Sequence, residues 1–333
     1  VRRPPMELAT HLRLLRAQYL LSSSSARASR IPLAPRRQAA PRRRALCSPA
    51  LAMARCLDAA VHVWASPEEA EGDFPYAEGQ ADPPVPGDTT LLVKEMAAAG
   101  VDGTLIVQPI NHKFDHSYVE RAMSLHPGKF AGCLLADPTR ADAAEEIEAL
   151  AKRGFRAVRF NPYLWPEGEG MTNPVGRAMY AKCGELGLPV GYMCFKGLPL
   201  HYDDIVALLE EYPKTQVLLD HFGFCQGTGG AGWPELLALA KYPQVHVKLS
   251  AWFRVSSAKY PAVTQDVQPM VRELVEAFGA GRLCWGTDFP FVTEHCTYTQ
   301  ARELADGLEL SGEEREMIMG GTLEKLLPGA WGE

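Results

Sequence analysis

The chain has 333 residues, of which 47% are hydrophobic and 22% charged, and its net charge is −6. The charge is divided unevenly, because residues 1–55 contain 12 Arg and one acid, Glu7, whereas residues 56–333 contain 22 basic and 39 acidic side chains. The long second part therefore carries −17, which would repel nucleic-acid phosphate, so we expect no nucleic-acid partner.

Residues 1–55 have the composition of an organelle transit peptide, being rich in Arg, Ser and Ala, with no Lys and with four serines at 22–25. A solvated disordered leader and a nucleic-acid-binding arm are the alternatives, although an arm would be expected to include Lys. Translation from Met6 would keep this leader, whereas translation from Met53 would remove it and leave the protein in the cytoplasm. Arg13 and Arg16 interrupt the apolar run 12–21, which is therefore too short for a membrane span of about 18 residues.

Residues 56–333 are predicted to form one domain in which short apolar runs alternate with helical patterns. The eight runs lie near 56–65, 103–109, 130–138, 156–163, 188–195, 216–222, 245–252 and 282–291. A helix is expected over 139–153, and Asn173, Asp203 and Ser311 are expected to be helix N-caps. This pattern predicts an α/β fold, a single (β/α)₈ TIM barrel, which takes about 250 residues. A doubly wound sheet would need a glycine-rich turn after the first run, and the sequence there is Trp-Ala-Ser-Pro.

The eight cysteines include no C-x-x-C pair, and Cys56, Cys133, Cys194 and Cys284 fall inside the apolar runs. This distribution predicts buried, reduced thiols rather than a disulfide framework or a zinc-finger site.

Barrel enzymes place their chemistry at the carboxyl ends of the strands, where strand alternation brings His62, His221 and Asp288 to the rim. Alternation also predicts that Asp58 and Ala60 share the face of His62. Taken singly, each rim residue has a structural alternative: a histidine bonded to backbone, a histidine paired with its neighbouring aspartate, or an aspartate that caps a turn. Their placement at three strand ends favours a shared site.

Five short motifs in order resemble the amidohydrolase-related TIM-barrel hydrolases, and the resemblance extends from about Leu57 to Pro328. The motifs are 58–64 (DAAVHVW), 155–161 (FRAVRFN), 218–223 (LLDHFG), 247–250 (VKLS) and 285–290 (WGTDFP). Within this family the chain is most similar to the branch of pyrone-dicarboxylate lactonase and other lactonases. Members with such leaders look plant-like, which favours the chloroplast, while the Arg-rich leader also suits the mitochondrion.

In the metal-using members of the family that the chain resembles, a His-x-His pair lies on the first strand and further histidines lie on the fifth and sixth. The resemblance implies that a metal site in this chain would use the same positions. Here Ala60 replaces the first histidine of the pair, and the fifth run has none. His62, His221 and Asp288 remain as ligands, and three protein ligands are the usual number for a catalytic zinc. We therefore expect that no cofactor is required, or that one divalent metal (zinc) binds weakly.

The resemblance further implies hydrolysis of a small carboxylated lactone or ester, with Asp288 activating water and His221 and His62 completing the catalytic set. Arg159 and Arg254 would bind a substrate carboxylate. The remaining candidate substrate-binding residues are Asn161, Tyr163, Ser250 and Gln108. The alternatives are a zinc-dependent decarboxylase of the same superfamily and a degenerate barrel that only binds a ligand. The expected partner is a small-molecule substrate, with no membrane, and homo-oligomerisation is left open.

Overall fold

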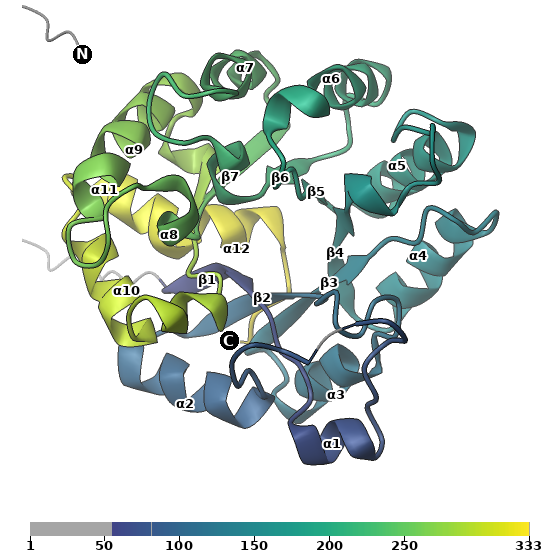
Figure 1. Ribbon diagram of the computed structural model, residues 1–333. Helices are drawn as coiled ribbons and strands as arrows, with labels where there is room; N and C mark the ends of the chain where they lie inside the picture. The colour runs from purple at the N-terminus through teal and green to yellow at the C-terminus, as the bar shows by residue number, and fades with distance from the viewer. Residues whose placement is uncertain (1–54, 81, 333) are drawn as a thin grey trace, which may run out of the picture. The chain divides into compact units, whose positions relative to one another are not determined.

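The computed structural model describes residues 55–80 and 82–332, so the predicted leader lies outside the described residues except for Arg55. Eight parallel strands follow one another around a barrel in chain order (Figure 1). They are β1 (Leu57–Val61), β2 (Gly103–Val107), β3 (Phe130–Leu135), β4 (Phe155–Phe160), β5 (Val190–Tyr192), β6 (Val217–Leu219), β7 (Val245–Leu249) and β8 (Leu283–Trp285). Val61 bridges Phe289, which joins β1 to the segment that follows β8. The predicted TIM barrel is confirmed.

Most of the helices lie outside the strands (Figure 1), whereas Leu323 of the last helix belongs to the apolar cluster inside the barrel. The helices are α1 (Pro67–Glu71), α2 (Thr89–Ala99), α3 (Ser117–Leu125), α4 (Ala143–Lys152), α5 (Pro174–Leu186), α6 (Tyr202–Glu211), α7 (Trp233–Ala238), α8 (Trp252–Val255), α9 (Thr264–Phe278), α10 (Tyr298–Asp306), α11 (Gly312–Glu316) and α12 (Thr322–Leu326). Asn173 and Ser311 cap α5 and α11 through their side chains, as predicted. The cap predicted at Asp203 is wrong, because α6 begins one residue earlier, at Tyr202.

Short 3₁₀ or π turns continue several strands and helices. They are η1 (Pro162–Leu164), η2 (Leu198–Leu200), η3 (His221–Phe224), η4 (Leu239–Lys241), η5 (Ala280–Arg282), η6 (Phe291–Glu294) and η7 (Met317–Gly321). The apolar runs predicted at 188–195, 216–222 and 282–291 are longer than the three-residue strands β5, β6 and β8. Apolar composition extends past the strand ends because the turns at the barrel mouth are buried as well.

Two apolar layers hold the barrel together, one inside it and one between the strands and the helices. Alternate strand residues such as Leu105, Ala131 and Cys284 fill the interior together with Trp331. Their neighbours, such as Ile106 and Leu283, pack against the helices. Residues that are apolar on both faces of a strand are expected when helices cover the outside of a parallel barrel.

The predicted alternation fails on β1, where Asp58 does not share the face of His62. The pairing register with β2 shifts between Asp58 and Val61, which is the mark of a β-bulge. The Asp58 carboxylate accepts hydrogen bonds from the Thr287 hydroxyl at 2.6 Å and from the hydroxyl of Tyr298 in α10 at 2.9 Å. It therefore faces the helix layer and joins β1, the β8 turn and α10.

Strand alternation also fails at the end of β6. Leu218 packs inside the barrel while Val217 and Leu219 pack outside, so Asp220 is the next residue to face inward. His221 reaches the mouth because its backbone turns into the left-handed region at φ 50°. A non-glycine residue in this region costs about 1–3 kcal/mol and is typical of functional sites.

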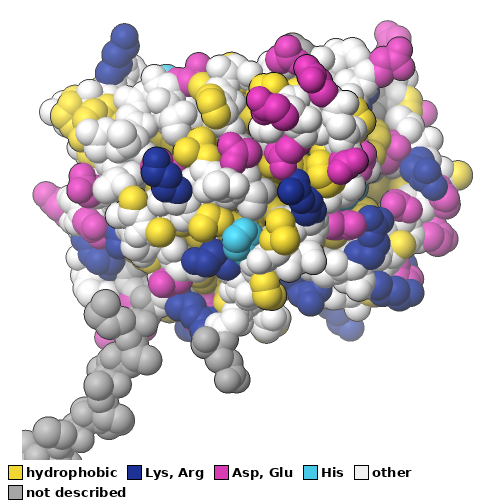
Figure 2. All heavy atoms as spheres, turned by 90° about the horizontal axis from the view of Figure 1, so that it is seen from below, with side chains coloured by type: hydrophobic (Ala, Val, Ile, Leu, Met, Phe, Trp, Pro, Cys, Tyr) yellow, Lys and Arg dark blue, Asp and Glu magenta, His cyan; other side chains and the backbone are white. Residues whose placement is uncertain are grey.

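The described surface is mixed in charge. Figure 2 shows one face on which Lys and Arg side chains are interspersed with Asp and Glu, rather than forming a continuous basic stripe. None of the described helices has the length and hydropathy needed to cross a bilayer. The cysteines within residues 55–332 are free thiols, and all are buried except Cys296, which is half-buried, so the prediction of reduced thiols is confirmed for this part of the chain.

Candidate active site

Asp288 lies at the mouth of the barrel directly after β8, and its side chain is only 2% exposed. Its backbone adopts φ 65°, and its amide donates to the carbonyl of Ala60 at 2.8 Å. The neighbouring residue Thr287 donates its amide to the Asp58 carboxylate at 3.0 Å. The backbone that carries Asp288 is therefore fixed to β1 on both sides of the turn.

His62 and His221 both direct Nε2 toward the same carboxylate oxygen, Oδ1 of Asp288, at 3.3 and 3.7 Å. The second nitrogen of each ring is also held. Nδ1 of His62 lies 2.8 Å from the carbonyl oxygen of Val107, which can only accept, so this nitrogen carries a proton. Nδ1 of His221 lies 2.7 Å from the Ser250 hydroxyl, which can donate or accept. The His62 ring is therefore held in place by β2, and the His221 ring by the residue that follows β7.

Arg254 approaches Asp288 from the opposite side, since its Nε donates to Oδ2 at 3.2 Å. The terminal nitrogens of this guanidinium make no hydrogen bond to the described residues. Burial raises the pKa of Asp288, but His221, His62 and Arg254 together hold it below the ordinary value of 3.8. Burial lowers the pKa of His221 to about 4, against the opposing effect of Asp288. At neutral pH the site therefore contains a charged carboxylate beside a neutral His221.

A second buried charge cluster is formed by residues of β4 and β7 and by the residue that follows β6. Asp220 is fully buried and contacts Arg159 Nη2 and Lys248 Nζ, each at 2.9 Å. Burial raises the pKa of Asp220, but the two cations outweigh it and hold the pKa well below its usual range. We did not expect Lys248 from strand alternation, although a lysine inside the otherwise apolar run 245–249 is a visible signal in the sequence.

A cavity of about 240 Å³ lies above these groups. Its charged and titratable wall consists of His62, Arg159, His221, Arg254 and Asp288. Its apolar wall consists of Pro109, Ile110, Met193, Phe195, Phe224 and Phe291. The sequence analysis proposed the first set and missed the second, because the apolar residues come from loops after four different strands and share no motif.

The other predicted substrate-binding residues are near the mouth but do not line this cavity. Gln108 donates to the carbonyls of Lys113 and Asp115 at 3.0 and 2.7 Å and so holds the loop after β2. Asn161 accepts from the amide of Tyr163, whose hydroxyl in turn accepts from a backbone amide at 2.9 Å. Ser250 contacts the site through His221. In the structure each of these side chains supports a loop or a ring.

A divalent metal at the mouth would have the side chains of His62, His221 and Asp288 as donors. Position 60 offers only a methyl group, and β5 ends without a histidine. Among residues 55–80 and 82–332 no group of three or more His, Cys, Asp or Glu side chains has the arrangement of a metal site.

The charge around this position also opposes a divalent cation. Arg254 already pairs with Asp288, and the two cations Arg159 and Lys248 share the single carboxylate of Asp220. The fixed cations therefore outnumber the carboxylates before any metal is added, and like charges repel one another. The residues present do not fit a resident zinc ion.

Comparison with known proteins gives one family and several relatives. The family model described as Amidohydrolase matches residues 57–329. The chain is 28% identical over 253 residues to the 4-sulfomuconolactone hydrolase of Hydrogenophaga intermedia, covering 72% of this chain and 75% of that protein. It is also 28% identical over 208 residues to the L-fucono-1,5-lactonase of Burkholderia ambifaria, covering 59% of this chain and 67% of that protein.

Solved structures show the same fold. A probable 2-pyrone-4,6-dicarboxylic acid hydrolase from Acinetobacter baumannii, with citric acid bound, superposes with a TM-score of 0.68 at 20% identity over 82% of this chain and 99% of that one. An amidohydrolase from Burkholderia multivorans with bound zinc gives a TM-score of 0.66 at 18% identity, with the same coverage of 82% and 99%. Zinc therefore occurs in a barrel of this shape.

Proposed function

We propose, from the premise that this chain belongs to the amidohydrolase family and is a hydrolase, that it opens a small carboxylated lactone without a resident metal. The observation that carries this proposal is the convergence of His62 Nε2, His221 Nε2 and Arg254 Nε on the single carboxylate of Asp288. Relatives named as lactone hydrolases support the substrate class.

The nucleophilic water would lie between Asp288 and His62. With the ring proton on Nδ1, the Nε2 atom of His62 is an acceptor 3.3 Å from the Asp288 oxygen. A water molecule has two O–H bonds and can donate one to each of these two acceptors. Asp288 would remove one of its protons as the hydroxide oxygen bonds to the lactone carbonyl carbon.

His221 would stabilise the negative charge that develops on the carbonyl oxygen. When the Ser250 hydroxyl donates to Nδ1, the proton of the neutral ring is on Nε2, which lies 3.7 Å from Asp288 Oδ1 at the wall of the cavity. A donor aimed at a developing oxyanion is worth about 2.7–4 kcal/mol of barrier. Collapse of the tetrahedral adduct breaks the ring C–O bond, and the proton taken by Asp288 passes to the leaving alkoxide. The products are a carboxylic acid and an alcohol.

Arg254 and Arg159 would bind the substrate carboxylate. Nε of Arg254 is used by Asp288, so the two terminal nitrogens remain for a carboxylate in the bidentate arrangement that suits a guanidinium. Arg159 lines the same cavity, and its Nε is buried without a hydrogen-bond partner among the described residues. The two arginines would hold the anionic end of the substrate beside the attacking water.

The proposal is tested by assaying the purified full chain against a matched panel of lactones, each with and without a ring carboxylate, before and after treatment with chelator. We expect hydrolysis of the carboxylated members that resists the chelator, with no stoichiometric zinc by elemental analysis. Activity that requires stoichiometric zinc would instead revive the decarboxylase alternative. Hydrolysis of no panel member would favour a barrel that only binds a ligand.

The pH dependence of kcat/KM follows from the two groups whose pKa values are shifted. Asp288 must be charged and His221 neutral, and both conditions hold above about pH 4, given the pKa of about 4 for His221. We therefore expect kcat/KM to stay level from about pH 7 to about pH 5 and to fall near pH 4. Circular dichroism at each pH separates titration from acid unfolding. A half-maximal value near pH 6.5 would mean that His221 titrates at its ordinary pKa and would contradict this assignment.

Replacing Ala60 by His tests whether the missing ligand alone explains the poor metal fit. We expect Ala60→His to bind zinc only weakly and to gain no rate, because Arg159, Lys248 and Arg254 remain in place. Zinc content and chelator-sensitive activity provide the readout, with Ala60→Gln as a control of similar bulk and weaker affinity for metal. Stoichiometric zinc with a higher rate in Ala60→His alone would identify an eroded metalloenzyme.

We also propose that residues 1–55 direct the chain to the chloroplast, with the mitochondrion as the alternative. The support is their composition, with 12 Arg and a single acid. A fusion of residues 1–55 to a fluorescent protein tests this. Import into plastids would support the proposal, and a diffuse cytoplasmic signal would contradict it.

A further inference from the structure

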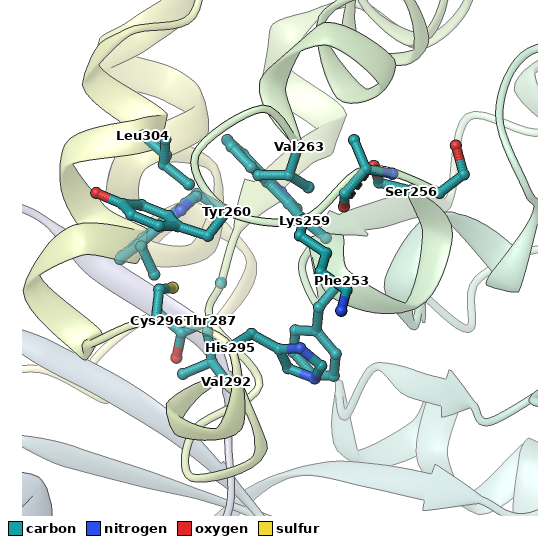
Figure 3. Close-up of a pocket in the computed structure, with 16 residues that line it drawn as sticks. Phe253, Ser256, Lys259, Tyr260, Val263, Thr287, Val292, His295, Cys296 and Leu304 are labelled. Atoms are coloured by element: carbon teal, nitrogen blue, oxygen red, sulfur yellow. Dashed lines mark hydrogen bonds between the residues drawn. The ribbon is translucent and has the colours of Figure 1, made fainter.

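A second cavity, of about 210 Å³, lies on the other side of α8 from the candidate active site. Its wall is mainly apolar and includes Trp252 and Trp285. Val263 and Leu304 also line it (Figure 3). The same view shows Tyr260, Lys259 and Val263 entering from the loop before α9, while His295 and Cys296 enter from the turn after β8. None of these residues takes part in the proposed reaction.

The loop that forms one side of this cavity is held open by its own hydrogen bonds. Asp266 accepts from the Ser256 hydroxyl at 2.8 Å and from the Ser257 amide at 3.0 Å. It also accepts from the Ala258 amide at 3.2 Å. The cavity is therefore formed before any ligand arrives, which lowers the entropic cost of binding.

Lys259 and His295 enter this cavity, and the ammonium group of Lys259 has no ionic partner among the described residues. Lys259 is exposed and forms no ion pair or hydrogen bond within this part of the chain. His295 stacks on Phe253, with ring centroids 4.4 Å apart, and its ring nitrogens form no recorded hydrogen bond to the described residues. The cavity thus combines an apolar interior with the ammonium group of Lys259, which has no ionic partner among the described residues.

We propose that this cavity binds a small aromatic carboxylic acid, with the ring against the two tryptophans and the carboxylate at Lys259. The volume is sufficient, since an apolar cavity of about 150 Å³ holds a benzene ring. The charge is complementary, because a ligand carboxylate at the mouth would give Lys259 the ionic partner that the described residues do not supply. A sugar or another polyhydroxylated ligand would instead leave its hydroxyl groups unpaired against the apolar wall.

The second cavity and the catalytic cavity are separated by side chains that contact one another. Phe253 lines the second cavity, and the next residue, Arg254, holds its guanidinium 5.0 Å from the Phe253 ring and 5.3 Å from the Phe291 ring. Phe291 lines the catalytic cavity, whereas Val292 lines the second. Phe253 and Arg254 thus lie between the two cavities.

The test is isothermal titration of the full chain with benzoate, using benzamide as the neutral probe of the same shape. We expect Lys259→Met to weaken one benzoate binding event by about threefold to tenfold, since an exposed ion pair contributes about 1 kcal/mol. Benzamide binding should be unchanged by this substitution. Lys214→Met, in an exposed loop away from both cavities, is the matched control and should leave both titrations unchanged.

Ala301→Phe provides an independent variant, because the methyl group of Ala301 lines the cavity and a larger ring would fill it. We expect this variant to lose the same binding event while its thermal unfolding stays close to that of the wild type. Arg254→Met identifies benzoate bound in the catalytic cavity. If benzoate does not bind, or if Arg254→Met abolishes all binding while Lys259→Met and Ala301→Phe change nothing, the inference is overturned. These readouts do not require turnover, so they remain decisive whatever the lactone assay shows.

Discussion

Asp288→Asn is expected to lower kcat for lactone hydrolysis by about 10²- to 10⁴-fold, the usual contribution of a positioned general base. The amide is almost the same size as the carboxylate but cannot take a proton from water at neutral pH. It also removes the negative charge to which His62 and Arg254 are directed. The measurement is steady-state kinetics on the lactone that proves to be the best substrate.

The control for this experiment is Asp306→Asn, which changes a half-exposed carboxylate on α10 that contacts Arg302. It should leave kcat within about twofold of the wild type, because an exposed ion pair contributes about 0–1 kcal/mol to stability and does not touch the cavity. Circular dichroism should show that both variants are folded. If Asp288→Asn kept more than about a tenth of the wild-type kcat, Asp288 would not be the general base.

Asp220→Ala is expected to destabilise the folded protein by about 3–5 kcal/mol, because it leaves Arg159 and Lys248 buried without a counter-charge. For a domain of this size such a loss lowers Tm by about 10 °C. Thermal unfolding monitored by circular dichroism measures the effect. Glu324→Ala, which removes an exposed partner of Arg55, is the control and should change stability by about 0.5 kcal/mol or less.

A second substitution shows whether the uncompensated charge is the cause. Lys248→Met removes one buried cation, so the double variant Asp220→Ala with Lys248→Met should recover part of the lost stability. Since the folded-state pKa of Asp220 is depressed, its contribution is present above the ordinary carboxylate pKa and is lost as pH falls through the depressed value. A double variant less stable than Asp220→Ala would mean that Lys248 acts mainly by packing.

The sequence was sufficient for the barrel and for the central residues of the candidate site. Helix and strand periodicities are local, and eight alternating units of the right length leave few folds to choose from. His62, His221 and Asp288 follow strands one, six and eight, and parallel strands of a barrel bring their carboxyl ends to one rim. The replacement at Ala60 and the absence of a histidine on β5 were equally visible in the sequence.

The tertiary structure decided which way the side chains face and which of them share charge. A β-bulge between Asp58 and Val61 turns Asp58 toward α10, and a left-handed turn brings His221 to the mouth. Neither feature follows from a two-residue repeat, because a bulge adds an unpaired residue that changes the alternation and a positive φ turns the chain locally.

The pairing of Asp220 with Lys248, and the cavity behind α8, depend on segments that are distant in the sequence and meet only when the barrel closes. The sequence by itself therefore determined the fold and the types of group at the rim. Burial and long-range contact decided their charge states, because desolvation and the distance between ionic groups exist only in the folded chain.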